Sequence, residues 1–354
     1  MSAEDWQAIW CRRSGWALLL YPLSWLYRFL LALQRLPYRW GWRRVVRAPV
    51  PVLVVGNVVL GGTGKTPTVQ ALVQHLRERG WTPGLVSRGH GRASDRGPRE
   101  VRPGAAPDQV GDEPALLQRR CQVPMVVDRN RPRAIEHLLR LHPQTDIVVS
   151  DDGMQHWRMA RDLTVVVFDD RGLGNGWCLP AGLLREPWPA PAWSGSAMLV
   201  LQTADSGAAL PGPYPVYPAQ RQLAATLIGP VGQRSALADW RPGTGSRPLA
   251  AVAGIGRPER FFAMLRQQGL PLARCVALPD HADGPLLRSA LDMDHVWFCT
   301  EKDAVKLFPL LGDGATNHPA LWAVPLQQTL APAFLAALDQ VLEPLSSPHG
   351  CQTA

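Results

Sequence analysis

Lysine is scarce in this chain of 354 residues. Only three of its 37 basic residues are lysines, at positions 65, 302 and 306, and arginine takes the basic role elsewhere. Such a bias is expected to spare lysine mainly where a compact, flexible ammonium group is needed. The lysines therefore mark two candidate sites, one at Lys65 and one in the segment TEKDAVK at 300–306.

Long apolar runs are also missing. No run of about twenty uncharged apolar residues occurs, which excludes a protein with several membrane spans. Hydrophobic residues make up 46% and charged residues 19%, so the chain is neither disordered nor fibrous. Its length suits one large or two medium domains.

Paired cysteines are absent, because the six cysteines lie singly and form no C-x-x-C motif. This excludes a zinc site or disulfide framework of the usual spacing and favours reduced thiols in a cytoplasmic setting. A cleaved signal peptide is not expected, since acidic residues open the chain and no small-residue cleavage site follows. The cysteines are Cys11, Cys121, Cys178, Cys275, Cys299 and Cys351.

Positive charge is concentrated at the N-terminus. The chain has a net charge of +8, and residues 1–50 hold eight arginines against two acidic residues, a net +6. The same segment contains six of the 14 tryptophans and three of the five tyrosines. This composition is typical of a membrane interface, whereas a nucleic-acid binder spreads its basic residues over a folded surface. No nucleic-acid partner is expected.

The segment 15–36 predicts an amphipathic helix. Its leucines recur at spacings of four and three, which places them on one face. Arg28 in the middle argues against a membrane span, because a central charge costs at least ~2.5–3.5 kcal/mol. We therefore expect a monotopic helix at the membrane interface, with arginines on anionic headgroups. A helix packed on the protein's own core and a true span are the alternatives. The leucines are Leu19, Leu23, Leu26, Leu30 and Leu33.

A phosphate-binding loop is predicted after the apolar strand at 47–55. Glycines permit a turn whose N–H groups point at an anion, and the helix that follows favours phosphate at its N-terminus. Lys65 would contact the β- and γ-phosphates, and the Thr66 hydroxyl would bind Mg²⁺. The strict Walker pattern is missed, because Val59 occupies its first glycine position. The alternative is a glycine-rich turn with an incidental lysine. The expected ATP-binding residues are Gly56, Asn57, Val58, Val59, Leu60, Gly61, Gly62, Thr63, Gly64, Lys65 and Thr66.

Acidic residues follow several apolar segments. Asp112 and Glu113 open a predicted helix, where helix capping alone would explain one carboxylate. The pairs 151–152 and 169–170 each follow a predicted strand, and a carboxylate at such a position near a phosphate loop usually anchors Mg²⁺. Composition does not choose between these two pairs, and a simple Asp-Gly turn remains an alternative for the first.

Three further polar residues are candidates. Arg88 and Arg185 could each clamp a phosphate or substrate, although an isolated arginine is more often solvated or structural. His281, flanked by acidic residues, could be a general base or orient one. The segment 300–303 could be only a helix capping box.

Taken in order, these motifs resemble the tetraacyldisaccharide 4'-kinase family, the lipid A 4'-kinases of Gram-negative bacteria. The resemblance covers nearly the whole chain, and its departures, His90, Met154 and Met159, touch no polar role. The matching segments are GNVVLGGTGKTP (56–67), SRGHG (87–91), GDEP (111–114), DDGMQHWRMARD (151–162), GNGWCLPAGLLRE (174–186), GIGRPERFF (254–262), PDH (279–281) and TEKDAVK (300–306).

The resemblance implies transfer of the γ-phosphoryl group of ATP to the 4'-hydroxyl of tetraacyldisaccharide 1-phosphate, with Mg²⁺. It implies that Asp112 and His281 accept the hydroxyl proton. It favours Asp151 and Asp152 as the magnesium pair, joined by Thr66 and Glu113. It places the enzyme on the cytoplasmic face of the bacterial inner membrane, as a peripheral or monotopic protein on an anionic surface. No obligate protein partner is inferred.

The alternation of predicted strands and helices indicates an α/β fold, with a P-loop NTPase-like parallel sheet covered by helices on both faces. A Pro/Gly-rich break at 204–219 and a hairpin near 220–235 lead to a smaller second α/β lobe. We expect a membrane-associated arm at 1–48, a kinase domain at 49–205 and the second lobe at 206–354.

Two other functions fit parts of the pattern. Another membrane-associated P-loop kinase or a GTPase would share the phosphate loop, but a guanine-reading segment would need a different residue order from Thr300–Asp303. A nucleotide-dependent membrane scaffold would need the loop but not Asp112 and His281.

Overall fold

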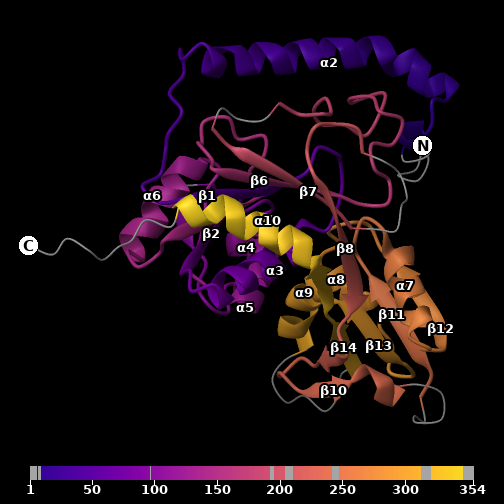
Figure 1. Ribbon diagram of the computed structural model, residues 1–354. Helices are drawn as coiled ribbons and strands as arrows, with labels where there is room; N and C mark the ends of the chain where they lie inside the picture. Colours follow the sequence, from indigo (N-terminus) through magenta and orange to yellow (C-terminus); the bar gives the residue numbers. More distant parts are fainter. Residues whose placement is uncertain are drawn as a thin grey trace, which may run out of the picture.

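The protein consists of two β-sheets with helices packed on them and a long N-terminal helix (Figure 1). The computed structural model describes residue 6 and residues 9–95, 97–191, 195–203, 210–240, 247–311 and 320–345. Cys351 and residues 204–209 of the predicted Pro/Gly-rich break lie outside the described residues.

The first sheet is mainly parallel and has nine strands in the described part of the chain. Its central strand is β1, whose five residues are all buried because helices or loops cover both faces. Leu53 and Val55 point to one face, and Val52 and Val54 point to the other. In order across the sheet the strands are β15 (Leu326–Leu330), β8 (Val216–Leu223), β7 (Ala197–Gln202), β6 (Leu163–Phe168), β1 (Val52–Gly56), β5 (Ile147–Asp151), β2 (Pro83–Ser87), β4 (Met125–Val127) and β3 (Arg99–Glu100).

Helices cover both faces of this sheet, as the sequence predicts for an α/β fold. The apolar sides of α3, α5 and α10 join one core with Leu53 and Val55. The apolar side of α6 joins the opposite core with Val52 and Val54. These helices are α3 (Lys65–Glu78), α5 (Asp112–Cys121), α6 (Arg131–Leu141) and α10 (Pro332–Leu342), with a short α4 (Pro107–Val110) before α5 and a 3-10 turn η2 (Glu343–Leu345) after α10.

The second sheet forms the core of the smaller lobe and has six described strands. Phe261, Phe262 and Leu265 of α7 cover one face, and α8 and α9 cover the other. In order the strands are β10 (Arg234–Ala236), β9 (Thr226–Ile228), β14 (Ala320–Val324), β13 (Val296–Thr300), β11 (Leu249–Ala253) and β12 (Leu272–Ala277). The helices are α7 (Pro258–Gln267), α8 (Gly284–Ser289) and α9 (Glu301–Leu311), with a 3-10 turn η1 (Leu237–Trp240). The hairpin expected near 220–235 is β9–β10, a few residues later.

The C-terminal end of the chain does not stay with the second sheet. β8 pairs with β7 and with β15, so both strands belong to the first sheet, although they lie beyond residue 205. α10 then packs on the same sheet (Figure 1). Sequence pattern specifies that a strand forms, but not which of two sheets it joins, because its partner is about a hundred residues away. The domain limits at residues 48 and 205 stay predictions.

The N-terminal helix α2 (Gly15–Arg39) lies along the outside of the first lobe (Figure 1). Its inner side is attached at several points. The rings of Tyr21 and Trp177 lie 4.4 Å apart, and Ser24 Oγ donates to the carbonyl oxygen of Cys178 at 2.7 Å. The leucines of its other face are between 45% and 68% exposed, so this face is not packed on the protein's own core.

Candidate active site

The predicted phosphate loop lies between the end of β1 and the start of α3. Asn57 holds the loop together from inside, since its buried Nδ2 donates to the Val59 carbonyl oxygen at 2.8 Å and to Thr63 Oγ1 at 3.0 Å. Lys65 Nζ donates to Asn57 Oδ1 at 3.3 Å. The side chain of Asn57 therefore ties the start of the loop to its lysine.

Gly64 is the point at which the loop becomes α3. Its φ of +85° is in the left-handed region, which costs glycine little and other residues more. A Cβ atom here would also meet the guanidinium group of Arg221, a residue of β8. The backbone conformation therefore favours glycine at this position, and a side chain would also displace the guanidinium group of Arg221.

The segment before Glu186 lies along the loop. Leu60 N–H donates to the Leu183 carbonyl oxygen at 2.9 Å, and Gln155 Nε2 donates both to the Asn57 carbonyl oxygen at 3.0 Å and to Glu186 Oε1 at 2.7 Å. Glu186, with a side chain only 1% exposed, also pairs with Arg35 of α2. A buried chain of polar contacts thus connects the N-terminal helix to the phosphate loop.

Asp151 and Asp152 lie at the end of β5, which neighbours β1 in the sheet. Lys65 Nζ is 3.4 Å from Asp152 Oδ1, and Arg185 Nη1 is 3.5 Å from the same oxygen. Asp151 Oδ2 accepts a hydrogen bond from Ser87 Oγ at 3.2 Å. The structure therefore brings together the predicted lysine, the predicted carboxylate pair and one predicted clamp.

Asp112 meets His281 across the two lobes. Asp112 is the first residue of α5, and its Oδ2 is 3.3 Å from His281 Nδ1. Lys306 Nζ of α9 is 2.6 Å from the same oxygen and donates to the Ala282 carbonyl oxygen at 3.0 Å. Lys302 Nζ lies 3.4 Å from His281 Nε2. Both lysines of the segment 300–306 thus surround the predicted acid–histidine pair.

Asp303 of the same segment has a structural position. Its buried carboxylate accepts hydrogen bonds from Gly254 N–H at 3.2 Å and Thr300 Oγ1 at 2.6 Å. The contact with Gly254 ties the start of α9 to the residue after β11. Asp303 N–H also donates to Thr300 Oγ1 at 3.3 Å, which is one of the two bonds of the predicted capping box. Because this carboxylate is buried and already accepts hydrogen bonds, it is not placed to bind a guanine base, as the GTPase alternative would need.

Two predicted site residues, Arg88 and Glu113, lie at the ends of their elements and are less buried than Asp151. Arg88 is exposed at the end of β2, and Glu113 is half-buried in the first turn of α5. Glu113 nevertheless lies near enough to Asp151 for its charge to act on that carboxyl.

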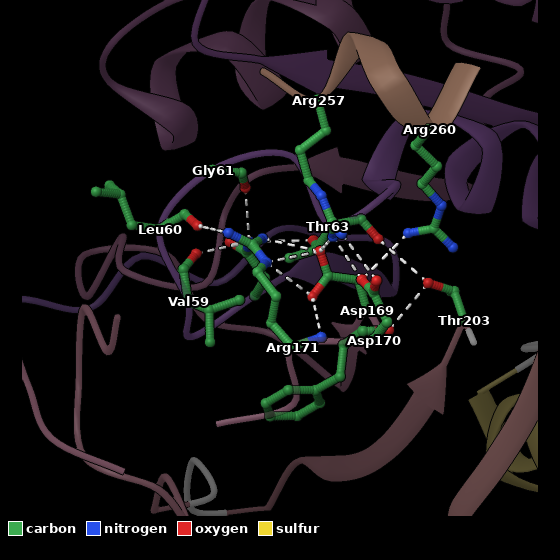
Figure 2. A network of polar contacts seen from close by, with 12 residues as sticks. Val59, Leu60, Gly61, Thr63, Asp169, Asp170, Arg171, Thr203, Arg257 and Arg260 are labelled. Carbon is green, nitrogen blue, oxygen red and sulfur yellow. Dashed lines mark hydrogen bonds and ion pairs between the residues drawn. The ribbon is translucent and has the colours of Figure 1, made fainter. Parts of the chain in front are cut away.

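The second acidic pair is occupied by arginines (Figure 2). Asp169 pairs with Arg171, and Asp170 pairs with Arg257, the residue before α7, and with Arg260 of α7. Sequence analysis found the two acids but not their partners, because single arginines do not stand out in a chain so rich in them. Arg131, which donates to the Asp151 carbonyl oxygen at 3.3 Å, was missed for the same reason.

Comparison with known proteins identifies the family. The family profile described as tetraacyldisaccharide-1-P 4'-kinase matches residues 16–343. The chain belongs to this family. The tetraacyldisaccharide 4'-kinase of Delftia acidovorans is 48% identical over 349 residues, covering 98% of this chain and 97% of the relative. That of Acidovorax sp. strain JS42 is 47% identical over 345 residues, covering 98% and 96%.

The fold is shared with a solved structure. LpxK from Aquifex aeolicus, crystallised in complex with ATP, superposes with a TM-score of 0.77 at 24% identity, over 94% of this chain and 99% of that chain. The resemblance inferred from the motifs is confirmed, and the predicted class of enzyme, a lipid kinase, is confirmed with it. The predicted α/β fold is confirmed as well.

The carboxylates at the loop suit a magnesium ion. Asp151 Oδ1 is buried and has no hydrogen-bond partner among the described residues. In the same part of the chain, no three side chains of His, Cys, Asp or Glu converge as a complete metal cage. Mg²⁺ is usually held by one or two carboxylates together with substrate phosphates and water. Asp151 and Asp152 beside Lys65 fit that pattern.

Burial, together with the neighbouring negative charges of Glu113 and Asp152, raises the pKa of the Asp151 carboxyl to about 7. Without a cation, the folded protein therefore keeps a proton on Asp151 in a range where the unfolded chain has lost it. The contribution of Asp151 to the stability of the folded state then falls as pH rises from about 4 toward 7.

Replacing Asp151 by asparagine is expected to remove this loss. The melting temperature of Asp151→Asn relative to the unchanged protein should rise with pH through this window and level off above it. Thermal unfolding of both proteins in a chelator between about pH 4.5 and 8 measures the difference. A difference that stays constant over that range would contradict the buried carboxyl's assigned protonation.

Proposed function

We propose that this protein transfers the γ-phosphoryl group of ATP to the 4'-hydroxyl of tetraacyldisaccharide 1-phosphate, giving the bis-phosphorylated lipid A precursor. Family membership supports the substrate and the reaction. The structural observation that carries the proposal is the Asp112–His281 contact at 3.3 Å. Asp112 is followed by Glu113, whose charge acts on Asp151 at the end of β5, beside the phosphate loop. A proton acceptor and a phosphate-binding site therefore occupy one region of the molecule.

Residues 56–66 would hold the nucleotide phosphates. The loop N–H groups and the N-terminus of α3 favour an anion, and Lys65 adds a positive charge. Asp151, Asp152, Glu113 and Thr66 would hold Mg²⁺, which neutralises charge on the phosphate oxygens when bound. Phosphoryl transfer needs positioning and charge neutralisation rather than covalent chemistry by the protein.

Asp112 would accept the proton of the 4'-hydroxyl. Lys306 Nζ at 2.6 Å and His281 Nδ1 at 3.3 Å both contact its Oδ2, which limits the movement of the carboxylate. His281 would orient the carboxylate or share its proton. Arg185, already 3.5 Å from Asp152, and the exposed Arg88 would neutralise charge on the transferred group or on the lipid phosphate.

The exposed face of α2 would dip into the cytoplasmic leaflet of the inner membrane. By length and composition α2 could also cross a membrane, a test that some core helices and leader segments pass too. Attachment of its inner side to the body at Tyr21, Ser24 and Arg35 supports a helix lying in the membrane surface. No nucleic-acid or obligate protein partner is proposed.

Replacing Leu23 and Leu26 by glutamine is expected to weaken binding to anionic vesicles about 100-fold, since each exposed leucine contributes roughly 1.5 kcal/mol when buried in lipid. Vesicle flotation with phosphatidylglycerol-containing liposomes measures the change. Leu141→Gln with Leu310→Gln, at similarly exposed positions elsewhere, is the matched control. Equal binding by the α2 variant and this control would contradict an interfacial α2.

The reaction itself is tested with labelled ATP and detergent-dispersed tetraacyldisaccharide 1-phosphate. Label is expected in the lipid, at the 4'-position. ATP binding without label in this lipid would contradict the proposal, and labelling of another lipid acceptor would favour a different membrane-associated kinase.

A further inference from the structure

The segment Asp169–Arg171 follows β6, which neighbours β1 on the side opposite β5. The proposed function uses Asp151 and Asp152, and leaves these three charged residues without a role. They nevertheless form a dense network with the phosphate loop on one side and α7 on the other (Figure 2).

Asp169 fixes the side chain of Arg171. Arg171 Nε lies 3.1 and 3.0 Å from the two carboxylate oxygens, and Nη2 lies 2.8 Å from Oδ2. The two side chains are 1% and 9% exposed. A buried guanidinium held by both oxygens of a carboxylate has little freedom to rotate. Its remaining donor, Nη1, therefore points in a defined direction.

That donor reaches the phosphate loop. Arg171 Nη1 donates to the Leu60 carbonyl oxygen at 3.0 Å, and the Leu60 N–H is bound to Leu183. A trans peptide places its C=O and N–H on opposite sides. Holding the Leu60 oxygen toward Arg171 therefore turns the Gly61 N–H away from Arg171.

Gly61 is fitted to this arrangement. Its φ is +90°, and a Cβ atom there would lie 3.3 Å from Arg171 Nη1. The guanidinium thus packs directly against the loop at this residue. A phosphate-binding loop works through N–H groups that point inward at the anion before it arrives.

We propose that Arg171 is a positioning residue for the nucleotide. Locked by Asp169, it orients the Leu60–Gly61 peptide so that the Gly61 N–H faces the phosphates. The inference rests on the proposed function only in taking residues 56–66 as the nucleotide site. Asp170, in the same segment, accepts hydrogen bonds from Arg257 Nη1 at 2.6 Å and from Arg257 Nη2 at 2.9 Å. This pair holds the start of α7 beside the segment.

The test is the affinity for Mg²⁺-ATP, measured by calorimetry on the full chain. Arg171→Met is expected to raise the dissociation constant about tenfold or more, the worth of one charge-assisted hydrogen bond. KM for ATP should rise in parallel, while KM for the lipid stays within about twofold, since only the nucleotide side loses a contact. Arg274→Met, which breaks the Arg274–Asp292 pair at 2.8 Å on the second lobe, is the matched control.

Asp169→Asn provides the second arm, because it keeps the shape of the side chain and removes the charge that locks Arg171. It should weaken ATP binding in the same direction, and the double variant should be no worse than Arg171→Met alone, since both act through one contact. A melting curve for each variant shows whether it is folded. If Arg171→Met does not fold, the ATP affinity of Asp169→Asn tests the proposal instead.

ATP affinity within about twofold of the unchanged protein in a folded variant would overturn the proposal, whatever happens to turnover. Fully additive effects of the two substitutions would overturn it as well. Failure of the unchanged protein to label the lipid would instead count against the proposed function, because the ATP-binding arm does not depend on the acceptor.

Discussion

Lys65→Ala is expected to lower turnover about 10²–10³-fold or more, the typical cost of removing one preorganised charge from a transition state. Lys65 Nζ lies between Asn57 Oδ1 at 3.3 Å and Asp152 Oδ1 at 3.4 Å, with its side chain 12% exposed. In the unchanged protein with ATP bound, the ammonium group of Lys65 would contact the β- and γ-phosphates, and alanine removes that contact. The labelled-ATP assay on the lipid acceptor measures the loss.

Lys65→Arg sharpens this prediction. Arginine keeps the charge, but its planar fork is larger than an ammonium group and cannot replace it in a tight loop. We expect little rescue, even though arginine is the usual basic residue of this chain. Arg47→Lys, a basic exchange at a residue 64% exposed on the same lobe, serves as the control. Turnover near normal in Lys65→Arg would contradict the view that lysine was retained here for its shape.

Asp112→Asn is expected to lower turnover about 10²–10⁴-fold, the range for loss of a general base. ATP binding should stay within about threefold, because Asp112 belongs to α5 and not to the phosphate loop. Asparagine fills the same space but does not accept the hydroxyl proton. Single-turnover labelling and ATP calorimetry on the same preparation separate the two effects.

In Asp112→Asn, the side chain of Lys306, which is 10% exposed, loses its charge partner, and this loss needs a separate control. Melting temperature shows whether that loss unfolds the protein, since an unpaired buried charge is destabilising. Asp108→Asn changes an exposed aspartate four residues earlier and should have no effect on turnover. Turnover above about a tenth of normal in a folded Asp112→Asn would exclude Asp112 as the base.

Most secondary structure was predictable because its signals are local. The apolar run before Gly56 becomes β1, and the helix expected at 65–79 is α3 at Lys65–Glu78. β15 was missed, because the pattern predicts a strand near 320–325 and a helix near 329–342, and this helix takes in the last two residues of β15. β15, with the sequence LQQTL, lacks the continuous apolar run that reveals β1, and its five residues are too few for an alternating period to be recognised.

The candidate site was predictable where a residue type was rare or a motif was ordered. Lys65 stood out because lysine is scarce, and the phosphate loop because strand, glycines and helix occur in sequence. Arg171 and Arg221 did not stand out, since arginine is common in this chain. Their positions against the phosphate loop are visible only in the structure.

The sequence by itself determined the alternation of strands and helices, the phosphate loop, the amphipathic period of α2 and the family. The family resemblance already favoured Asp151 and Asp152 for the phosphate site, and the structure places Asp152 beside Lys65. Only the tertiary structure decided that the second acidic pair meets arginines, that Lys306 joins Asp112, and that β15 returns to the first sheet. Local pattern fixes backbone conformation and the side of an element that is apolar. Contacts such as Lys306–Asp112 join residues nearly two hundred positions apart, so they depend on how whole sheets and helices pack.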